Sequence, residues 1–115
     1  MIKYINFTLY KDNRREQDHK NIKAVYNDNS YSFLLDKVKT KLNDNNFSRE
    51  NEEFLFNIDL INKTASYLLK EKNTTFDIEV EELILSRESD RIVLEYKISS
   101  DEEKFKIILE ENKNE

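Results

Sequence analysis

The sequence predicts an all-β domain, in which an antiparallel meander closes into a small barrel or a strongly curled sheet. Several segments alternate apolar and polar residues with a period of two, which is typical of strands with one buried face. Clusters of Asn, Asp and Ser separate these segments, as expected for hairpin turns. The chain of 115 residues is long enough for one core and no more.

The period-two segments cover most of the chain. Their apolar positions are Ile5, Phe7 and Leu9; Tyr31, Phe33 and Leu35; Val38, Thr40 and Leu42; Phe76, Ile78 and Val80; Ile92, Leu94, Tyr96 and Ile98; and Phe105, Ile107 and Leu109. The polar residues between them then face water from the other side of the pleat. The alternation changes phase between Val80 and Leu83, which predicts a bulge or a bend near Glu81 and Glu82.

Polar clusters at 27–29, 43–46, 71–73, 87–90 and 99–102 are candidate hairpin tips. Because the chain contains no glycine, a turn residue with positive φ must be Asn or Asp, the other residues that tolerate this conformation best. The polar stretch from Lys11 to Asn21 is predicted to be a loop or disordered. We expect a single domain over residues 1–110, followed by a disordered tail over residues 111–115.

Residues 52–70 fit two interpretations. The segment from Phe54 to Leu60 alternates as a strand does. The alternative, an α+β fold with a helix over residues 52–70, rests on apolar residues at helical spacing: Phe54, Ile58, Ile61, Ala65, Leu68 and Leu69. Asn51 would then be the N-cap of the helix. A helix would leave Phe56 and Tyr67 together on its other face, so the strand interpretation is favoured.

A set of segments in a fixed order also matches a known pattern: Leu42-Asn43-Asp44-Asn45-Asn46-Phe47, Glu53-Phe54-Leu55-Phe56, Ala65-Ser66-Tyr67-Leu68-Leu69, Phe76-Asp77-Ile78-Glu79-Val80, Ile92-Val93-Leu94-Glu95-Tyr96-Lys97-Ile98 and Phe105-Lys106-Ile107-Ile108-Leu109. This order resembles the YwiB-like bacterial domain of unknown function, whose members are small lipocalin-like (calycin) β-barrels. The resemblance implies a lipocalin-like barrel and strands over residues 54–69. Asn73-Thr74-Thr75 stands where members usually place a glycine. The family has no established activity, so no functional residue is carried over.

Composition and charge exclude several classes of function. Without cysteine the chain has no disulfide, catalytic thiolate or sulfur-ligated metal, which suits a reducing cytoplasm. The net charge of −5 argues against nucleic-acid binding. No apolar run reaches the roughly 18 residues that would cross a bilayer, and the first residues lack the features of a signal peptide. We therefore expect a cytoplasmic protein that is a monomer, or a homodimer joined through a sheet edge.

No group of residues forms a recognisable catalytic or metal site. His19, the only histidine, lies in the polar stretch and lacks a catalytic partner nearby in the sequence. One run of acids follows a predicted strand: Asp77, Glu79, Glu81 and Glu82. We expect these acids to face solvent and to pair with the lysines of later strands, Lys97, Lys104 and Lys106. The sequence therefore predicts no catalytic, cofactor-binding or metal-binding residue.

The aromatic residues, seven Phe and six Tyr, are the main clue to function. They either fill the barrel or line an apolar cavity, and for so short a chain filling is favoured. We expect a non-enzymatic binding module, without a cofactor, for an apolar small ligand or a protein partner. The alternative is an acidic regulatory or immunity-like protein that binds a basic protein partner, because opposite charges speed such an association.

Overall fold

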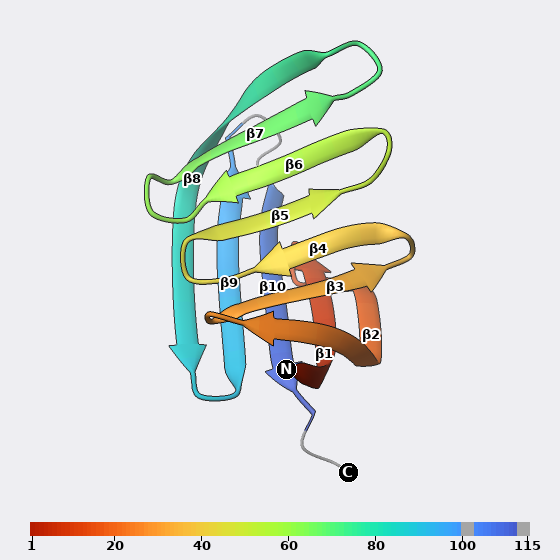
Figure 1. The fold of residues 1–115 in the computed structure, drawn as a ribbon. Helices are drawn as coiled ribbons and strands as arrows, with labels where there is room; N and C mark the ends of the chain where they lie inside the picture. The colour runs from red at the N-terminus through yellow and green to blue at the C-terminus, as the bar shows by residue number, and fades with distance from the viewer. Residues whose placement is uncertain (100–102, 113–115) are drawn as a thin grey trace.

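The described residues fold into a closed barrel of ten antiparallel strands (Figure 1). The computed structural model describes residues 1–99 and 103–112. The strands are β1 (Ile2–Lys11), β2 (Arg14–Asn27), β3 (Ser30–Leu35), β4 (Val38–Leu42), β5 (Asn46–Glu50), β6 (Phe54–Asp59), β7 (Thr64–Leu69), β8 (Thr74–Glu88), β9 (Arg91–Ile98) and β10 (Glu103–Glu111). The predicted all-β barrel is therefore confirmed.

Strands that follow one another in the sequence are neighbours in the barrel, and β1 pairs with β10 to close it. Burial alternates along the strands as the period-two pattern predicts. In β9, for example, the side chains of Ile92, Leu94, Tyr96 and Ile98 are buried, whereas the residues between them are half-buried. The meander follows from the short turns, since a turn of a few residues can join only antiparallel neighbours.

Two long strands, β2 and β8, turn the corners between two layers of the barrel. In Figure 1, β3 to β7 cross in front of β1 and β8 to β10. β8 pairs first with β7 and then, from Val80 onward, with β9. β2 pairs with β1 along most of its length and with β3 only at residues 25–27. The register of β8 shifts between Val80 and Glu82, which confirms the predicted bulge and bends the strand at its corner.

The polar stretch from Lys11 to Asn21 is not a loop, so this prediction was wrong. Residues 14–21 belong to β2, and the turn that connects β1 to β2 consists of Asp12 and Asn13. Only Gln17 and His19 are half-buried in the first part of β2, while the other side chains are exposed. The sequence of this part therefore has no apolar face, and its order comes from pairing with the apolar strand β1.

Residues 52–70 form β6, β7 and the turns beside them, so the strand interpretation is confirmed and the helical alternative is wrong. Asn51 is not a helix N-cap. Its Oδ1 accepts hydrogen bonds from the backbone N–H groups of Glu53, at 2.8 Å, and Phe54, at 3.0 Å, in the turn before β6. Among the described residues, no helix is long and apolar enough to cross a membrane.

The hairpin turns use Asn and Asp as predicted. The predicted tips at 27–29, 43–46, 71–73 and 87–90 each contain a turn between consecutive strands, whereas residues 100–102 of the fifth tip lie outside the described residues. Asp28 and Asn29 have φ values of 51° and 63°, as in the type I′ turns that fit the twist of a hairpin. Lys37 and Lys63 also have positive φ, at 68° and 58°, which the sequence did not predict. Such a residue costs about 1–2 kcal/mol, which the adjoining strand pairs offset.

The sheet extends beyond the predicted domain boundary at residue 110. Glu111 is the last residue of β10, and its carboxylate pairs with Lys3 at 2.9 Å and accepts a hydrogen bond from Tyr31. The backbone N–H of Asn112 donates to the carbonyl of Tyr4 at 2.7 Å. Residues 113–115, the remainder of the predicted tail, lie outside the described residues.

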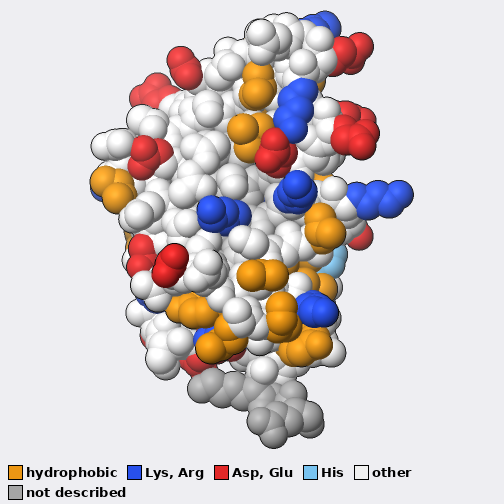
Figure 2. Space-filling view, in the orientation of Figure 1, with side chains coloured by type: hydrophobic (Ala, Val, Ile, Leu, Met, Phe, Trp, Pro, Cys, Tyr) orange, Lys and Arg blue, Asp and Glu red, His pale blue; other side chains and the backbone are white. Residues whose placement is uncertain are grey.

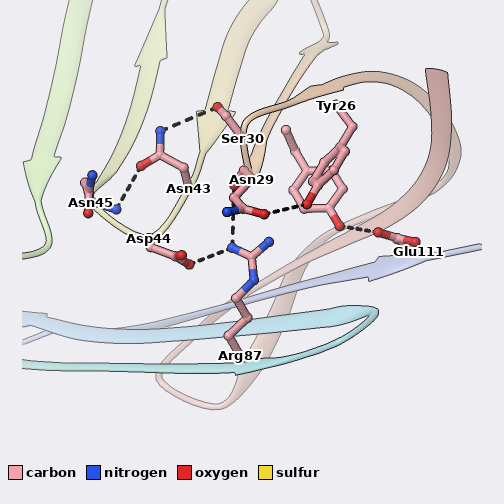
Figure 3. A network of polar contacts seen from close by, with 9 residues as sticks. Tyr26, Asn29, Ser30, Asn43, Asp44, Asn45, Arg87 and Glu111 are labelled. Carbon is pink, nitrogen blue, oxygen red and sulfur yellow. Dashed lines mark hydrogen bonds and ion pairs between the residues drawn. The ribbon is translucent and has the colours of Figure 1, made fainter. Parts of the chain in front are cut away.

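A polar network joins β8 to the hairpin tips of the opposite layer (Figure 3). Arg87 donates from Nη1 to Asp44 Oδ1 at 2.6 Å and to the carbonyl of Asn29 at 3.5 Å. The Tyr26 hydroxyl donates to the side chain of Asn29 at 2.8 Å. Arg87 therefore connects the two layers where β8 has passed its corner and no longer pairs with β7.

Candidate functional site

The two ends of the barrel interior are packed differently. At the end that holds the chain termini in Figure 1, the interior is closed by aliphatic side chains that are at most 2% exposed: Ile5, Leu35, Leu42, Ile92, Leu94 and Leu109. We call this the filled end. At the other end the side chains of β5 to β7 and of β1, β9 and β10 line a partly open cavity of about 220 Å³, and we call this the cavity end. A ten-stranded barrel is wider than the eight-stranded barrels that side chains just fill, which leaves room for this cavity.

The cavity is lined mainly by aromatic and aliphatic side chains. Its ten described lining residues are Phe7, Leu9, Phe47, Arg49, Phe54, Phe56, Tyr67, Tyr96, Phe105 and Ile107. Phe7, Phe47 and Ile107 are at most 1% exposed and form its floor. Leu9, Phe54, Tyr67 and Phe105 are only half-buried, so they form its rim. The expectation that side chains would fill the whole barrel is therefore wrong at this end.

Stacked rings stiffen the wall of the cavity. Phe54 and Tyr67 face each other across β6 and β7, with ring centroids 5.5 Å apart and planes 7° from parallel. Tyr96 and Phe105 stack in the same way across β9 and β10, at 5.1 Å and 17°. Tyr96 and Phe105 are directly opposite each other on neighbouring strands, whereas Phe54 is two residues from Phe56, the residue opposite Tyr67. Large side chains at such cross-strand positions stabilise a sheet. Two stacked ring pairs therefore form part of the cavity wall.

Arg49 is the one charged residue among the described lining residues. It lies on β5 two residues after Phe47, so both side chains point into the barrel. Its neighbours on the flanking strands are Thr40 and Phe56. The Arg49 Nε atom is buried and has no hydrogen-bond partner, and no carboxylate within the described residues lies at ion-pair distance from this side chain. A half-buried cation thus lines an apolar cavity, and its buried Nε atom has no partner within the described residues.

The electrostatics of the cavity follow from burial. Burial lowers the pKa of the Arg49 guanidinium, and the electrostatic effects of Tyr96 and Asp36 partly oppose this shift. An arginine nevertheless keeps its charge in proteins. Burial raises the pKa of the Tyr96 phenol, against a smaller opposite effect of Arg49. At neutral pH the cavity therefore presents the guanidinium of Arg49 and the phenols of Tyr96 and, at the rim, Tyr67 in otherwise apolar surroundings.

Comparison with known proteins gives no relative. No family model, curated protein or solved structure matches the chain. The resemblance to the YwiB-like domain therefore stays a prediction, and the function has to be argued from the site itself.

A second concave feature lies on the outside, between β2 and the hairpin of β3 and β4. This outer groove is lined by the exposed apolar side chains of Ile2, Val25 and Leu34, by the more buried residues Ile22 and Phe33, and by three exposed lysines, Lys23, Lys39 and Lys41. Figure 2 shows hydrophobic side chains with Lys and Arg among them on the lower part of this face. Within the described residues the edge of β2 before Val25 has no strand partner on this side.

His19 lies in β2 and not in a loop, and it does not join the cavity. Its Nε2 is 3.3 Å from Gln17 Oε1, and its backbone pairs with that of Phe7. Throughout residues 1–99 and 103–112, no group of three or more His, Cys, Asp or Glu side chains could hold a metal ion.

The acids of β8 lie on the outside of the barrel, as predicted. Glu81 pairs with Lys97 at 3.3 Å and Glu82 with Lys104 at 3.4 Å, which confirms the expected pairing for these two lysines. Lys106 pairs instead with Glu95, at 3.9 Å. Glu81 and Glu82 therefore form cross-strand pairs, Asp77 and Glu79 are exposed, and none of the four acids belongs to a metal-binding group within the described residues.

Sequence reasoning identified the aromatic residues as the functional material but missed Arg49. Among the aromatic residues, Tyr4 and Phe76 are about half exposed and lie outside the core, at 47% and 52%. A local signal was available but was missed. Arg49 lies two residues after Phe47 and therefore on the same, inward face of a short strand, where a charged residue is unusual.

Proposed function

We propose that the protein is a non-enzymatic, cytoplasmic binding module that holds a small and largely apolar molecule in the cavity end of the barrel. The observation that carries this proposal is the cavity of about 220 Å³ with its floor of buried Phe and Ile and its rim of half-buried rings. Ligand sites in proteins are concave, mostly apolar and contain few polar groups. This cavity has that composition.

The size of the cavity limits the ligand. Sites for drug-sized molecules measure about 300–1,000 Å³, whereas a dry cavity of about 150 Å³ accommodates benzene. A volume of about 220 Å³ suits a single ring or a short alkyl chain. Because the rim side chains are half-buried, such a molecule can reach the cavity after small side-chain movements.

Native mass spectrometry of gently purified protein tests this function directly. We expect a mass above 13.9 kDa per subunit that returns to this value on denaturation. Protein stripped of ligand should bind benzyl alcohol or 1-octanol, with chemical-shift changes in amide NMR spectra that centre on β5, β6 and β10.

Two matched variants locate the binding. Leu9→Trp places a larger side chain at the rim and should abolish the binding of both alcohols. Ile84→Trp makes a similar enlargement on a side chain that is 59% exposed, and it should leave binding unchanged. If both alcohols fail to bind the wild type, or if the two variants behave alike, the interior is not the binding site.

The outer groove favours a second candidate, the binding of a protein partner that offers an extended acidic segment. The unpaired edge of β2 can accept an added strand, and exposed Leu34 lies beside it in the groove. Lys23, Lys39 and Lys41 form no ion pair within the described residues. Glu50, the acidic residue in the groove, pairs with Lys70, and this lysine lowers the pKa of the Glu50 carboxyl group. The acidic chain as a whole favours a basic partner, but this groove is locally basic.

A labelled peptide of alternating Glu and Val tests this second candidate by fluorescence anisotropy. We expect binding that weakens with salt and with Leu34→Asp. Ile84→Asp is the matched control, because Ile84 and Leu34 are about equally exposed, at 59% and 61%. Equal binding of a peptide with Lys in place of Glu would contradict this candidate.

A further inference from the structure

The cavity end contains a charge that its surroundings do not explain. The Nε atom of Arg49 is shielded from solvent and has no hydrogen-bond partner. Buried polar groups in proteins are nearly always hydrogen-bonded, and buried charges are nearly always paired. Methionine would fill the same space without either penalty. A group that is unsatisfied in the free protein is therefore available to a ligand.

The surroundings of Arg49 supply no internal partner. On the flanking strands its neighbours are Thr40 and Phe56, neither of which is an anion. Thr40 directs its hydroxyl to the carbonyl of Val38, at 3.4 Å. Asp36 is the carboxylate that interacts with Arg49 through space, but it lies on an exposed turn and forms no ion pair with it. The guanidinium therefore lines the cavity without an ion-pair partner within the described residues.

A second polar group lines the same cavity. Tyr96 is 6% exposed, and its ring stacks on Phe105 in the cavity wall. Burial keeps its phenol protonated, so its O–H can donate a hydrogen bond. The cavity thus combines a planar N–H donor array, the hydroxyl groups of Tyr96 and, at the rim, Tyr67, and apolar walls. Both polar groups donate to an oxygen anion, and the guanidinium fits a carboxylate with two parallel hydrogen bonds.

We propose that the ligand is a small monocarboxylate with an apolar body, whose carboxylate binds Arg49 and Tyr96 while its ring or short chain lies among Phe47, Phe54 and Phe105. This inference rests on the proposed function and adds the chemical class of the ligand. Arg49 is the anchor, since it supplies the opposite charge. Tyr96 adds a single hydrogen bond, and the aromatic floor and rim accept the body.

The anchor has a consequence for selectivity. A neutral molecule of the same shape leaves the guanidinium unpaired, whereas the carboxylate satisfies it. A ligand that makes a hydrogen bond to a charged group binds about 10 to 100 times more tightly than a similar ligand that does not. The wild type should therefore prefer octanoate to 1-octanol, and benzoate to benzyl alcohol, by about that factor.

Isothermal titration calorimetry of the ligand-free protein at neutral pH, with octanoate and 1-octanol as probes, tests the assignment. For Arg49→Met we expect a loss of octanoate affinity of about 10- to 100-fold, with 1-octanol binding equal or tighter. Arg91→Met is the matched control, since it removes the same charge from an exposed side chain of β9 and should change neither affinity.

Two further variants separate a specific anchor from general charge. Arg49→Lys keeps the charge but loses the planar fork, so its octanoate affinity should fall between those of the wild type and Arg49→Met. Tyr96→Phe removes one donor and should weaken octanoate by about tenfold or less, with no change for 1-octanol.

The outcomes distinguish the two proposals. If the wild type binds neither probe, the proposed function fails. If it binds 1-octanol at least as tightly as octanoate, or if Arg49→Met and Arg91→Met weaken octanoate equally, the cavity binds apolar molecules but the carboxylate assignment is overturned.

Discussion

The filled end and the cavity end belong to one barrel, yet they differ in what their side chains do. At the filled end, Ile5, Leu94 and Leu109 have no measurable exposure, and the layers of the barrel come together over aliphatic side chains. At the cavity end the lining is mostly aromatic, and it includes a cation without a partner. Flat rings stacked along the wall cover the sheet without reaching across it.

The difference in packing suggests different roles for the two ends, one in the stability of the fold and the other in binding. Close-packed aliphatic side chains supply most of the free energy of folding in a small domain. A cavity and a buried N–H group without a hydrogen-bond partner, such as the Nε of Arg49, both lower that free energy. The filled end therefore stabilises the barrel, and the cavity end is where the chain retains features that only a ligand would satisfy.

The largest effect should come from truncating matched leucines at the two ends. Leu94→Ala at the filled end should lower the free energy of unfolding by about 2–5 kcal/mol, because the site is closed on all sides. Leu9→Ala at the rim should lower it by about 1 kcal/mol, since Leu9 is half-buried beside an existing cavity. Urea unfolding measures both. If both substitutions lowered the free energy of unfolding equally, the two ends would contribute equally to stability.

Alkaline pH should destabilise the protein through both ends. Burial raises the pKa of Tyr96 at the cavity end and, together with the hydrogen bond to Glu111, the pKa of Tyr31 at the filled end. In the unfolded chain tyrosine has a pKa of about 10. The folded state therefore retains these protons longer, so its stability is complete below about pH 10 and decreases above it, by at most about 1.4 kcal/mol per pH unit for each group.

Tyr31→Phe and Tyr96→Phe should each reduce this dependence on pH. Urea unfolding between neutral pH and about pH 11 gives the slope for each variant. A slope that neither substitution changes would mean that both phenols ionise as easily in the folded protein as in the unfolded chain.

A smaller effect is expected at the corner between the layers. Arg87→Met removes the contacts with Asp44 and Asn29 and should lower the free energy of unfolding by about 0.5–1 kcal/mol, with faster amide exchange at both turns. Lys104→Met is the control. It breaks the exposed pair with Glu82 and should cost less than about 0.5 kcal/mol. Equal costs would assign Arg87 no part in joining the layers.

Much of the fold could be predicted from alternation and turn chemistry. Ile92 to Ile98 alternate without interruption, and the phase change after Val80 located the bulge of β8 correctly. Asp28 and Asn29 have the positive φ that the absence of glycine requires. The first part of β2 could not be predicted, because its mostly exposed side chains show no apolar alternation and the strand forms by pairing with β1.

The candidate site was less predictable for a physical reason. A cavity depends on the width of the barrel and on how rings from different strands stack, and neither is encoded within one segment. Phe54 and Tyr67 stack across two strands, and Arg49 lines the same cavity as Tyr96 of β9, which is far away in the sequence. The spacing of two residues between Phe47 and Arg49 does predict that the arginine points inward. The sequence around Arg49 does not show whether a residue of another strand pairs with it.

The most direct test of the account compares the stability of the wild type and of Arg49→Met, each with and without octanoate, by urea unfolding. Without ligand, Arg49→Met should be more stable than the wild type by about 1–2 kcal/mol, because it removes a buried, unsatisfied polar group. Octanoate at about 100 times its dissociation constant should stabilise the wild type by about 2.7 kcal/mol and the variant by much less, so that the order of stability reverses. If Arg49→Met is less stable than the wild type without ligand and gains as much from octanoate, Arg49 is a structural residue and the central claim is wrong.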